Sequence, residues 1–198
     1  IKMIKYYEEN FRILEKAIAS IDEKEYEKLL ENCYKAIEKG GKVIASGLGK
    51  NVPICEKFVG TMNSYGLPAS FLHTNTAVHG DLGIVKDEDV VILLSKSGNT
   101  AETLVLCHHL QKRKCDTWSL SCNKNAKSYA LTHENLFIDL EHEGDQWDIV
   151  PNNSTTVFLI VLQGIAIELA NRFKIDRESF GLNHPGGNIG ERLGSADK

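Results

Sequence analysis

The chain has 198 residues, of which 42% are hydrophobic and 25% charged. This composition is typical of a folded globular protein, and the length suits one domain with a small appendage, so an intrinsically disordered chain is excluded. The formal charge is −4. Because nucleic-acid binding depends on clustered cations, this balance argues against a nucleic-acid partner and for a local small-molecule site.

Five cysteines are present, and no two are spaced as CxxC. An odd number without paired spacing fits free thiols in a reducing compartment better than a disulfide framework or a zinc site. The longest apolar run, Val157–Ala170, has 14 residues. A bilayer span needs about 20 residues, so this run predicts a buried core helix. We therefore expect a cytoplasmic protein that does not bind membranes.

The first 40 residues predict two amphipathic helices, over residues 3–18 and 23–39, and Gly40-Gly41 ends the second. Apolar side chains recur along the first helix at steps of three and four residues, at Ile4, Tyr7, Phe11, Leu14 and Ile18. An apolar stripe of this kind is normally covered. We expect both helices to pack against the sheet or against a second subunit, which would make the protein a homo-oligomer.

After Gly41, short β-rich runs alternate with helical ones, which is the pattern of βαβ units around a parallel sheet. The predicted strands are Val43–Ser46, Ala69–Leu72, Val90–Ser95, Thr117–Ser121 and Leu136–Leu140. The predicted helices cover residues 51–65, 100–114, 124–131 and 154–174, the last with Ser154 as its N-cap. Ligands of such sheets bind at the carboxyl ends of the strands, so the loops that follow the strands are the candidate site.

Two of these loops suit an anion. The first strand ends in Ser46-Gly47-Leu48-Gly49-Lys50, which offers backbone N–H groups beside a lysine; a plain strand-to-helix turn is the alternative. The third strand ends in Ser95-Lys96-Ser97-Gly98-Asn99-Thr100, where hydroxyls and a glycine at the start of a helix suit a phosphate. Simple N-capping by Ser97 or Thr100 is the alternative there, and Glu102 could serve only to complement the helix dipole.

Two further loops contain histidine. His79-Gly80-Asp81-Leu82-Gly83 follows the second strand, where a surface turn is the alternative. Asn183-His184-Pro185-Gly186-Gly187-Asn188-Ile189-Gly190 lies near the carboxyl end, and its proline and glycines predict a loop that is not helical. A histidine fixed in such a loop can act as an acid or base near neutral pH.

In their order and spacing, these segments, together with Pro151 and Ser154-Thr155-Thr156, resemble the SIS (sugar isomerase) domain family over residues 42–193, and within it the arabinose 5-phosphate isomerases. The resemblance implies a flavodoxin-like α/β fold with a five-stranded parallel sheet flanked by helices. It also implies a phosphorylated sugar as ligand and a homotetramer. It divides the chain into an N-terminal helical arm (1–40), a SIS domain (41–193) and a tail (194–198).

Carried over position by position, the resemblance assigns catalysis to Lys50, Glu102, Glu143 and His184. It assigns substrate binding to Ser46, Gly47, Gly49, His79, Ser95, Ser97, Gly98, Asn99 and Thr100, and it matches His73 to a histidine that can take an inhibitory metal. The chain departs from the family pattern around Glu143, at Asn99, where the isomerases usually have glutamate, and at Asn152-Asn153. These departures leave the identity of the sugar open.

The implied reaction moves a carbonyl between C1 and C2 through an enediol, which requires a carboxylate base and a cation or N–H donor for the oxyanion. Either Glu102 or Glu143 could be the base, with Glu102 favoured, and Lys50 would stabilise the oxyanion. His184 could open the sugar ring or move the proton between oxygens, in its own site or in that of a neighbouring subunit, and no cofactor or metal is required. The alternative is a sugar-phosphate sensor without turnover, which would not need the acid–base residues.

Overall fold

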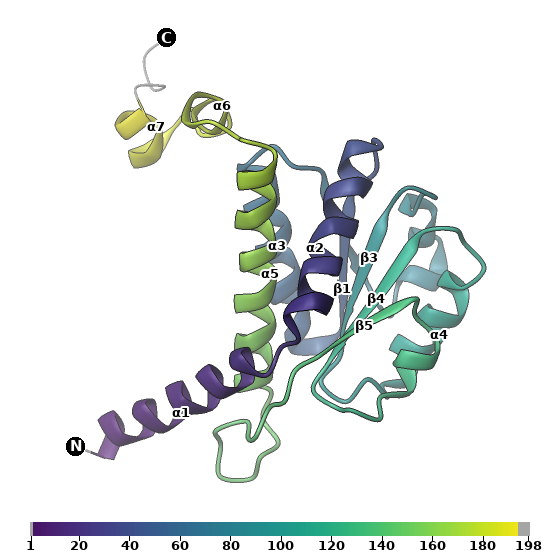
Figure 1. Cartoon of the computed structure of the whole chain (residues 1–198), viewed down its shortest axis with the longest axis vertical. Helices are drawn as coiled ribbons and strands as arrows, with labels where there is room; N and C mark the ends of the chain where they lie inside the picture. Colours follow the sequence, from purple (N-terminus) through teal and green to yellow (C-terminus); the bar gives the residue numbers. More distant parts are fainter. Residues whose placement is uncertain (1, 194–198) are drawn as a thin grey trace.

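The computed structural model describes residues 2–193 and contains a five-stranded, all-parallel sheet in the order β2-β1-β3-β4-β5 (Figure 1). This is the flavodoxin-like strand order, so the predicted fold class is confirmed. The central strands β1 and β3 are buried along their whole length, as expected for a parallel sheet covered on both faces. The strands are β1 (Val43–Gly47), β2 (Ala69–His73), β3 (Val90–Leu94), β4 (Asp116–Ser121) and β5 (Glu134–Phe137).

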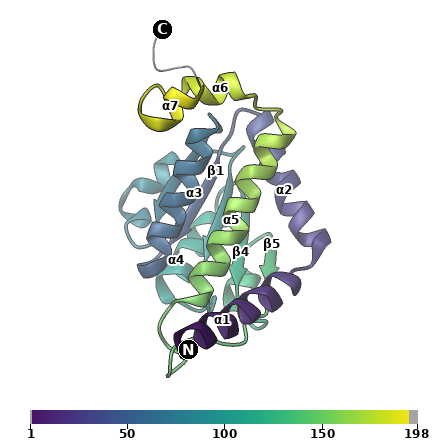
Figure 2. The same cartoon turned by 90° about the vertical axis from the view of Figure 1, so that its left-hand side faces the viewer.

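Helices cover the two faces of the sheet unequally (Figures 1 and 2). One face carries α2 (Glu23–Glu38), α3 (Val52–Ser64) and α5 (Asn153–Arg172), and the other carries α4 (Ala101–Leu110). Successive strand residues alternate between two cores: Val90, Ile92 and Leu94 join the first, and Val91 and Leu93 join the second. The strand period of two therefore builds both cores from one continuous apolar run.

Helix α5 is the helix predicted from the longest apolar run. By length and composition alone it could cross a membrane, and it is the one such helix in residues 2–193. Its most apolar window has a mean hydropathy of 1.5 and is 56% buried inside the protein. Phe158, Leu162 and Ile165 of this helix are fully buried in the larger core. It therefore packs as the predicted core helix.

Helix α1 (Lys2–Ala19) lies against α5 through its second half only, where Ile13 and Ala17 are buried. Its first half extends away from the body of the protein (Figure 1), with Ile4 63%, Tyr7 50% and Phe11 66% exposed. Of the two predicted helices, α2 packs on the sheet as expected, with Leu29, Leu30 and Cys33 in the larger core. Helix α1 packs on α5 instead and leaves the first half of its apolar stripe uncovered. Cover by a second subunit stays a prediction.

Two local predictions were wrong. Instead of a helix over 124–131 there is one 3₁₀ turn, η4 (Lys127–Ala130), because Asn123 and Asn99 accept backbone N–H bonds that hold this stretch as a turn. The segment 183–190 is not all loop: α6 (Arg177–Leu182) precedes it, and α7 (Gly187–Leu193) begins directly after Pro185 and Gly186. The predicted tail, 194–198, lies outside the described residues, and the division at residue 40 stays a prediction.

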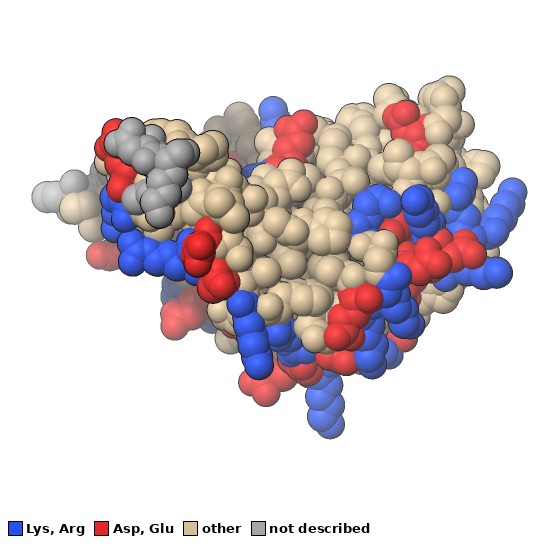
Figure 3. Space-filling model, turned by 90° about the horizontal axis from the view of Figure 1, so that it is seen from above, with Lys and Arg blue, Asp and Glu red and all other residues tan. Residues whose placement is uncertain are grey.

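The surface at the amino ends of the strands carries both signs of charge. Viewed from that end, lysine and arginine side chains alternate with aspartate and glutamate around an uncharged centre (Figure 3). Mixed charge of this kind does not form the cationic surface that a polyanion needs.

All five cysteines are free, and four of them are buried. Burial raises the pKa of the Cys55 thiol to about 12, so it is not a reactive thiolate.

Candidate active site

A cleft of about 510 Å³ opens at the carboxyl ends of β1 and β3. The chain runs from β1 to β2 on one side and then crosses to β3 on the other, so this is the point where the strand order reverses. Open α/β sheets bind their ligands at such a point. The cleft is lined by Leu48, Gly49, Lys50, Asn51, Leu94, Ser95, Lys96, Ser97, Thr100, Thr103, Pro151 and Ser154.

Three helices begin at this cleft: α3, which continues from the 3₁₀ turn η1 (Gly49–Asn51), α4 and α5. At the first turns of α3 and α4 the N-cap residues, Asn51 and Thr100, make no side-chain capping bond. By contrast, α2 and α6, which begin elsewhere, are capped by the carboxylates of Asp22 and Asp176. Uncapped N–H groups and the positive ends of two helix dipoles suit a bound anion.

The loop after β1 places Lys50 at the cleft. Gly49 has a φ of +59°, which is in the left-handed region that favours glycine, and this turns the chain into η1. Gly47 has a packing role, because a Cβ there would lie 2.8 Å from the Asn51 Cβ. Ser46 is 1% exposed and its hydroxyl lies 3.0 Å from the Thr74 hydroxyl, so both residues lie behind the cleft rather than in its lining.

The loop after β3 brings three predicted hydroxyls together at the cleft: Ser95, Ser97 and Thr100. The Ser95 and Thr100 hydroxyls are 3.2 Å apart, so the Thr100 side chain is engaged there instead of capping α4. Gly98 and Asn99 have structural contacts. A Cβ at Gly98 would clash with the Ala126 Cβ, and the Asn99 side chain accepts a bond from the Lys127 N–H.

Glu143 is fully buried behind the cleft, at 0% side-chain exposure. Its Oε2 accepts bonds from the N–H groups of Asn152 (3.0 Å) and Ser154 (2.9 Å), and its Oε1 accepts from the Ser154 hydroxyl (2.7 Å) and pairs with Lys96 Nζ (3.0 Å). Burial alone would raise the pKa of this carboxyl, but the bonds from Ser154 and Asn152 and the Lys96 ammonium together lower it. Ser154 is therefore not the N-cap of α5: Asn152 occupies that position, and Glu143 caps the helix.

Replacing Glu143 with glutamine is expected to lower the free energy of unfolding by about 2–4 kcal/mol at pH 7, because charge-assisted bonds to α5 and Lys96 are lost. The pKa of Glu143 is lower in the folded protein than in the unfolded chain. The stabilisation is therefore fully present above the unfolded-chain pKa of about 4.3, and it is lost as the pH falls through the lower pKa of the folded protein. Urea unfolding of both proteins from neutral pH down to about pH 3 should show the difference shrink on the acidic side. A difference that stays constant over this range would contradict the assignment.

The remaining predicted residues do not line the cleft. Glu102 is exposed on the first turn of α4, two residues after Thr100. His73 ends β2, and His79 is exposed on the 3₁₀ turn η2 (Ala77–His79). In residues 2–193 no group of three or more His, Cys, Asp and Glu side chains is placed to hold a metal ion, and a metal at His73 stays a prediction.

His184 lies at the other end of the molecule. It follows α6, which packs at the carboxyl end of α3: the Asn183 side chain donates to the Ser64 carbonyl (3.2 Å), and Phe180 contacts Tyr65. The His184 ring stacks on Phe180, with centroids 4.2 Å apart, and Nδ1 lies 2.8 Å from the Phe180 carbonyl oxygen. The cleft is at the first turn of α3, so the length of that helix, about 20 Å, separates His184 from Lys50 in one chain.

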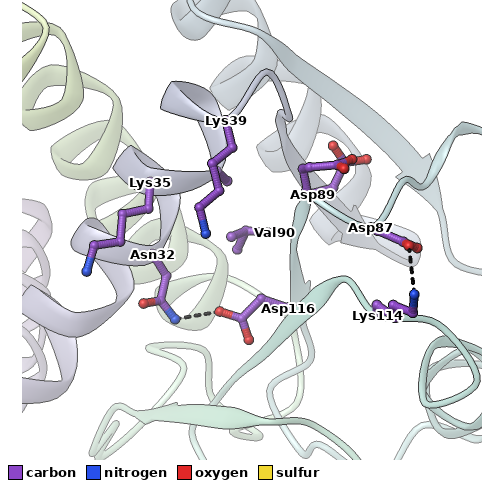
Figure 4. Close-up of a pocket in the computed structure, with 10 residues that line it drawn as sticks. Asn32, Lys35, Lys39, Asp87, Asp89, Val90, Lys114 and Asp116 are labelled. Carbon is purple, nitrogen blue, oxygen red and sulfur yellow. Dashed lines mark hydrogen bonds and ion pairs between the residues drawn. The ribbon is translucent and has the colours of Figure 1, made fainter.

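A second cavity, of about 240 Å³, lies at the amino ends of the strands (Figure 4). Some of its polar groups pair with one another: the Asn32 amide donates to Asp116, and Lys114 lies 3.7 Å from Asp87. It contains none of the residues predicted for the site, and charges of both signs line it. The cleft at the carboxyl ends is therefore the candidate active site.

The fold and the site define the class of this protein: a doubly wound α/β sheet with a cleft at its switch point whose lining suits an anion. Within that class, a sequence model of the SIS domain matches residues 36–170, so the chain belongs to the SIS domain family. The predicted family is thereby confirmed. The match spans the whole sheet and both loops that line the cleft.

Curated relatives include arabinose 5-phosphate isomerases named KdsD. The protein from Yersinia pestis is 31% identical over 182 residues, which cover 92% of this chain and 56% of the relative. The protein from Pseudomonas aeruginosa is 32% identical over 161 residues, covering 81% of this chain and 49% of the relative. The chain thus spans about half the length of the curated relatives that it matches.

Solved structures agree with the fold over nearly the whole chain. The structure of c3406 from E. coli CFT073 in complex with arabinose 5-phosphate superposes with a TM-score of 0.85 at 34% identity, covering 93% of this chain and 96% of that one. A putative phosphosugar isomerase involved in capsule formation from Bacteroides fragilis gives 0.84 at 29% identity, covering 93% and 98%. Both of these solved chains are thus matched over nearly their whole length, unlike the curated relatives.

Proposed function

We propose that this protein is a sugar-phosphate aldose–ketose isomerase that interconverts arabinose 5-phosphate and ribulose 5-phosphate, or a closely related pair, through an enediol. The observation that carries the proposal is the cleft itself. Two uncapped helix N-termini, the three hydroxyls of the loop after β3 and Lys50 all lie at this cleft. A phosphate bound there would fix the distance of the reacting carbons from the catalytic groups. The complex of c3406 with arabinose 5-phosphate, at 34% identity, supports the same class of ligand.

Glu102 is the better candidate for the base. Both oxygens of Glu143 already accept two bonds each, which fills the acceptor capacity of a carboxylate. Taking a proton from carbon would require Glu143 to give up bonds that hold α5. Among the described side chains, residues 4–193, none forms a hydrogen bond or ion pair with the Glu102 carboxylate. Glu102 lies on the first turn of α4, the helix that begins at the cleft. Lys50 would stabilise the enediolate oxygen as a fixed cation.

His184 would complete the site from a second copy of the chain. Because it lies about one α3 length from the cleft within its own subunit, it can take part only across an interface. The exposed side chains of Ile4, Tyr7 and Phe11 on α1 support a homo-oligomer, proposed as a tetramer, that covers them. In that arrangement His184 would assist ring opening and the proton transfer between oxygens.

The test is an NMR assay of the purified chain with arabinose 5-phosphate, ribulose 5-phosphate and a panel of other sugar phosphates. Interconversion of one pair without added cofactor or metal is expected. A folded protein that interconverts none of them would refute the proposal. If the same protein were stabilised against heat by a sugar phosphate, the sensor alternative would take its place.

A further inference from the structure

Lys96 is a cation inside the hydroxyl-rich loop that follows β3, and the family resemblance gives it no role. Its backbone is fixed by the neighbouring strand: its carbonyl accepts bonds from the Cys122 N–H and the Ser121 hydroxyl, both at 2.9 Å. Its side chain lines the cleft between Ser95 and Ser97 and is 41% exposed. A rigid backbone therefore carries this lysine to the place where the phosphate is expected.

The Lys96 ammonium pairs with a carboxylate that is itself held by burial and hydrogen bonds. Its Nζ lies 3.0 Å from Oε1 of Glu143, whose side chain is completely buried and bonded to the first turn of α5. An ammonium has three donors, and this pair uses one of them. No other hydrogen bond or ion pair with the side chains described, those of residues 4–193, or with the described backbone uses the remaining two. They are available to a ligand in the cleft.

The charge of the lining favours a dianion. Lys50 and Lys96 are the charged side chains among the described residues that line the cleft, and no carboxylate belongs to that lining. A phosphate monoester carries a charge of about −1.5 to −2 at pH 7. Two ammonium groups together with helix N-termini match that charge, whereas Lys50 alone would leave part of it unpaired or would be withdrawn from the enediolate.

We infer that Lys96 binds the phosphoryl oxygens of the substrate, and that Glu143 is the positioning residue that holds the ammonium over the loop at 95–100. The inference rests on the proposed function in taking a phosphorylated ligand, but it does not depend on turnover. It leaves Lys50 for the oxygen of the enediolate. It also explains why a carboxylate with a lowered pKa is kept buried beside the cleft.

The experiment titrates the full chain with inorganic phosphate in a calorimeter. Lys96→Met is expected to raise the Kd for phosphate about 10- to 100-fold, which is the effect of losing one charge-assisted bond. Lys96→Arg should recover at least half of the lost affinity on a logarithmic scale. Lys112→Met removes the same charge from an exposed position away from the cleft, and its Kd should match that of the wild type.

The role of Glu143 is tested by Glu143→Asp, which keeps the charge and shortens its reach. It should weaken phosphate binding at least about threefold when Lys96 is present and leave the Kd unchanged in the Lys96→Met background. Thermal unfolding identifies any variant that is not folded. A wild type that does not bind phosphate, or a Lys96→Met variant that binds it equally well, would overturn the inference. Lys96-dependent binding without isomerisation of any sugar phosphate would instead overturn the proposed function alone.

Discussion

Replacing Glu102 with glutamine is expected to lower kcat by about 10²- to 10⁴-fold, the range for loss of a general base. The amide cannot take the proton from carbon, and Glu143 cannot replace it because its four acceptor positions are filled. The Kd for phosphate should stay within about twofold of the wild type, since Glu102 does not line the phosphate cleft. Deuterium uptake from D₂O at the C2 carbon of the aldose should fall by the same factor as kcat.

The matched control is Glu56→Gln, which makes the same chemical change at an exposed position on α3. Its kcat should equal that of the wild type. If Glu102→Gln keeps the wild-type kcat while Glu143→Gln abolishes deuterium uptake, the base is Glu143. That result would mean that binding of substrate releases Glu143 from Ser154 and Asn152.

Activity should return when two inactive variants are mixed in one oligomer. Lys50→Met and His184→Ala are each expected to lower kcat by at least about 10²-fold. If His184 serves the cleft of another subunit, an equal mixture forms intact sites from an unaltered Lys50 of one chain and an unaltered His184 of the next. About one quarter of the sites should then be intact. Co-expression with two affinity tags, followed by the NMR assay, measures the recovered rate.

Mixing Lys50→Met with Glu102→Gln is the control for this experiment. Lys50 lines the cleft and Glu102 lies on the first turn of α4, which begins at that cleft, so one chain supplies both residues to a site. A mixed site would then lack one of them, and no recovery beyond that of the unmixed variants is expected. Recovery in this control, or none with the Lys50→Met and His184→Ala pair in oligomers shown by native mass spectrometry to be mixed, would place His184 outside the reaction. A stable monomer in light scattering would contradict the oligomer directly.

Most of the fold could be read from the sequence because its signals are local. Continuous apolar runs such as Val90–Leu94 define strands buried on both faces, and the helical periods between them require parallel crossovers. Two of the predictions that failed lie where local signals compete. The stretch predicted as a helix over 124–131 forms one 3₁₀ turn, because the Asn123 side chain accepts a backbone N–H bond there. The stretch predicted as a loop over 183–190 contains the start of a helix at Gly187, two residues after Pro185.

The alternating strand and helix patterns of the sequence determined the α/β class, and its charge argued against a nucleic-acid partner. Its loop motifs predicted an anion site at the carboxyl ends of β1 and β3. Only the tertiary structure decided which side chains meet there. Glu143 caps α5 and holds Lys96, which lies far from it along the chain, a contact that no local pattern encodes. The structure also placed His184 one helix length from Lys50, because α6 packs on the far end of α3. The sequence shows which functional side chains the chain carries. The packing of the helices decides which of them share a cleft.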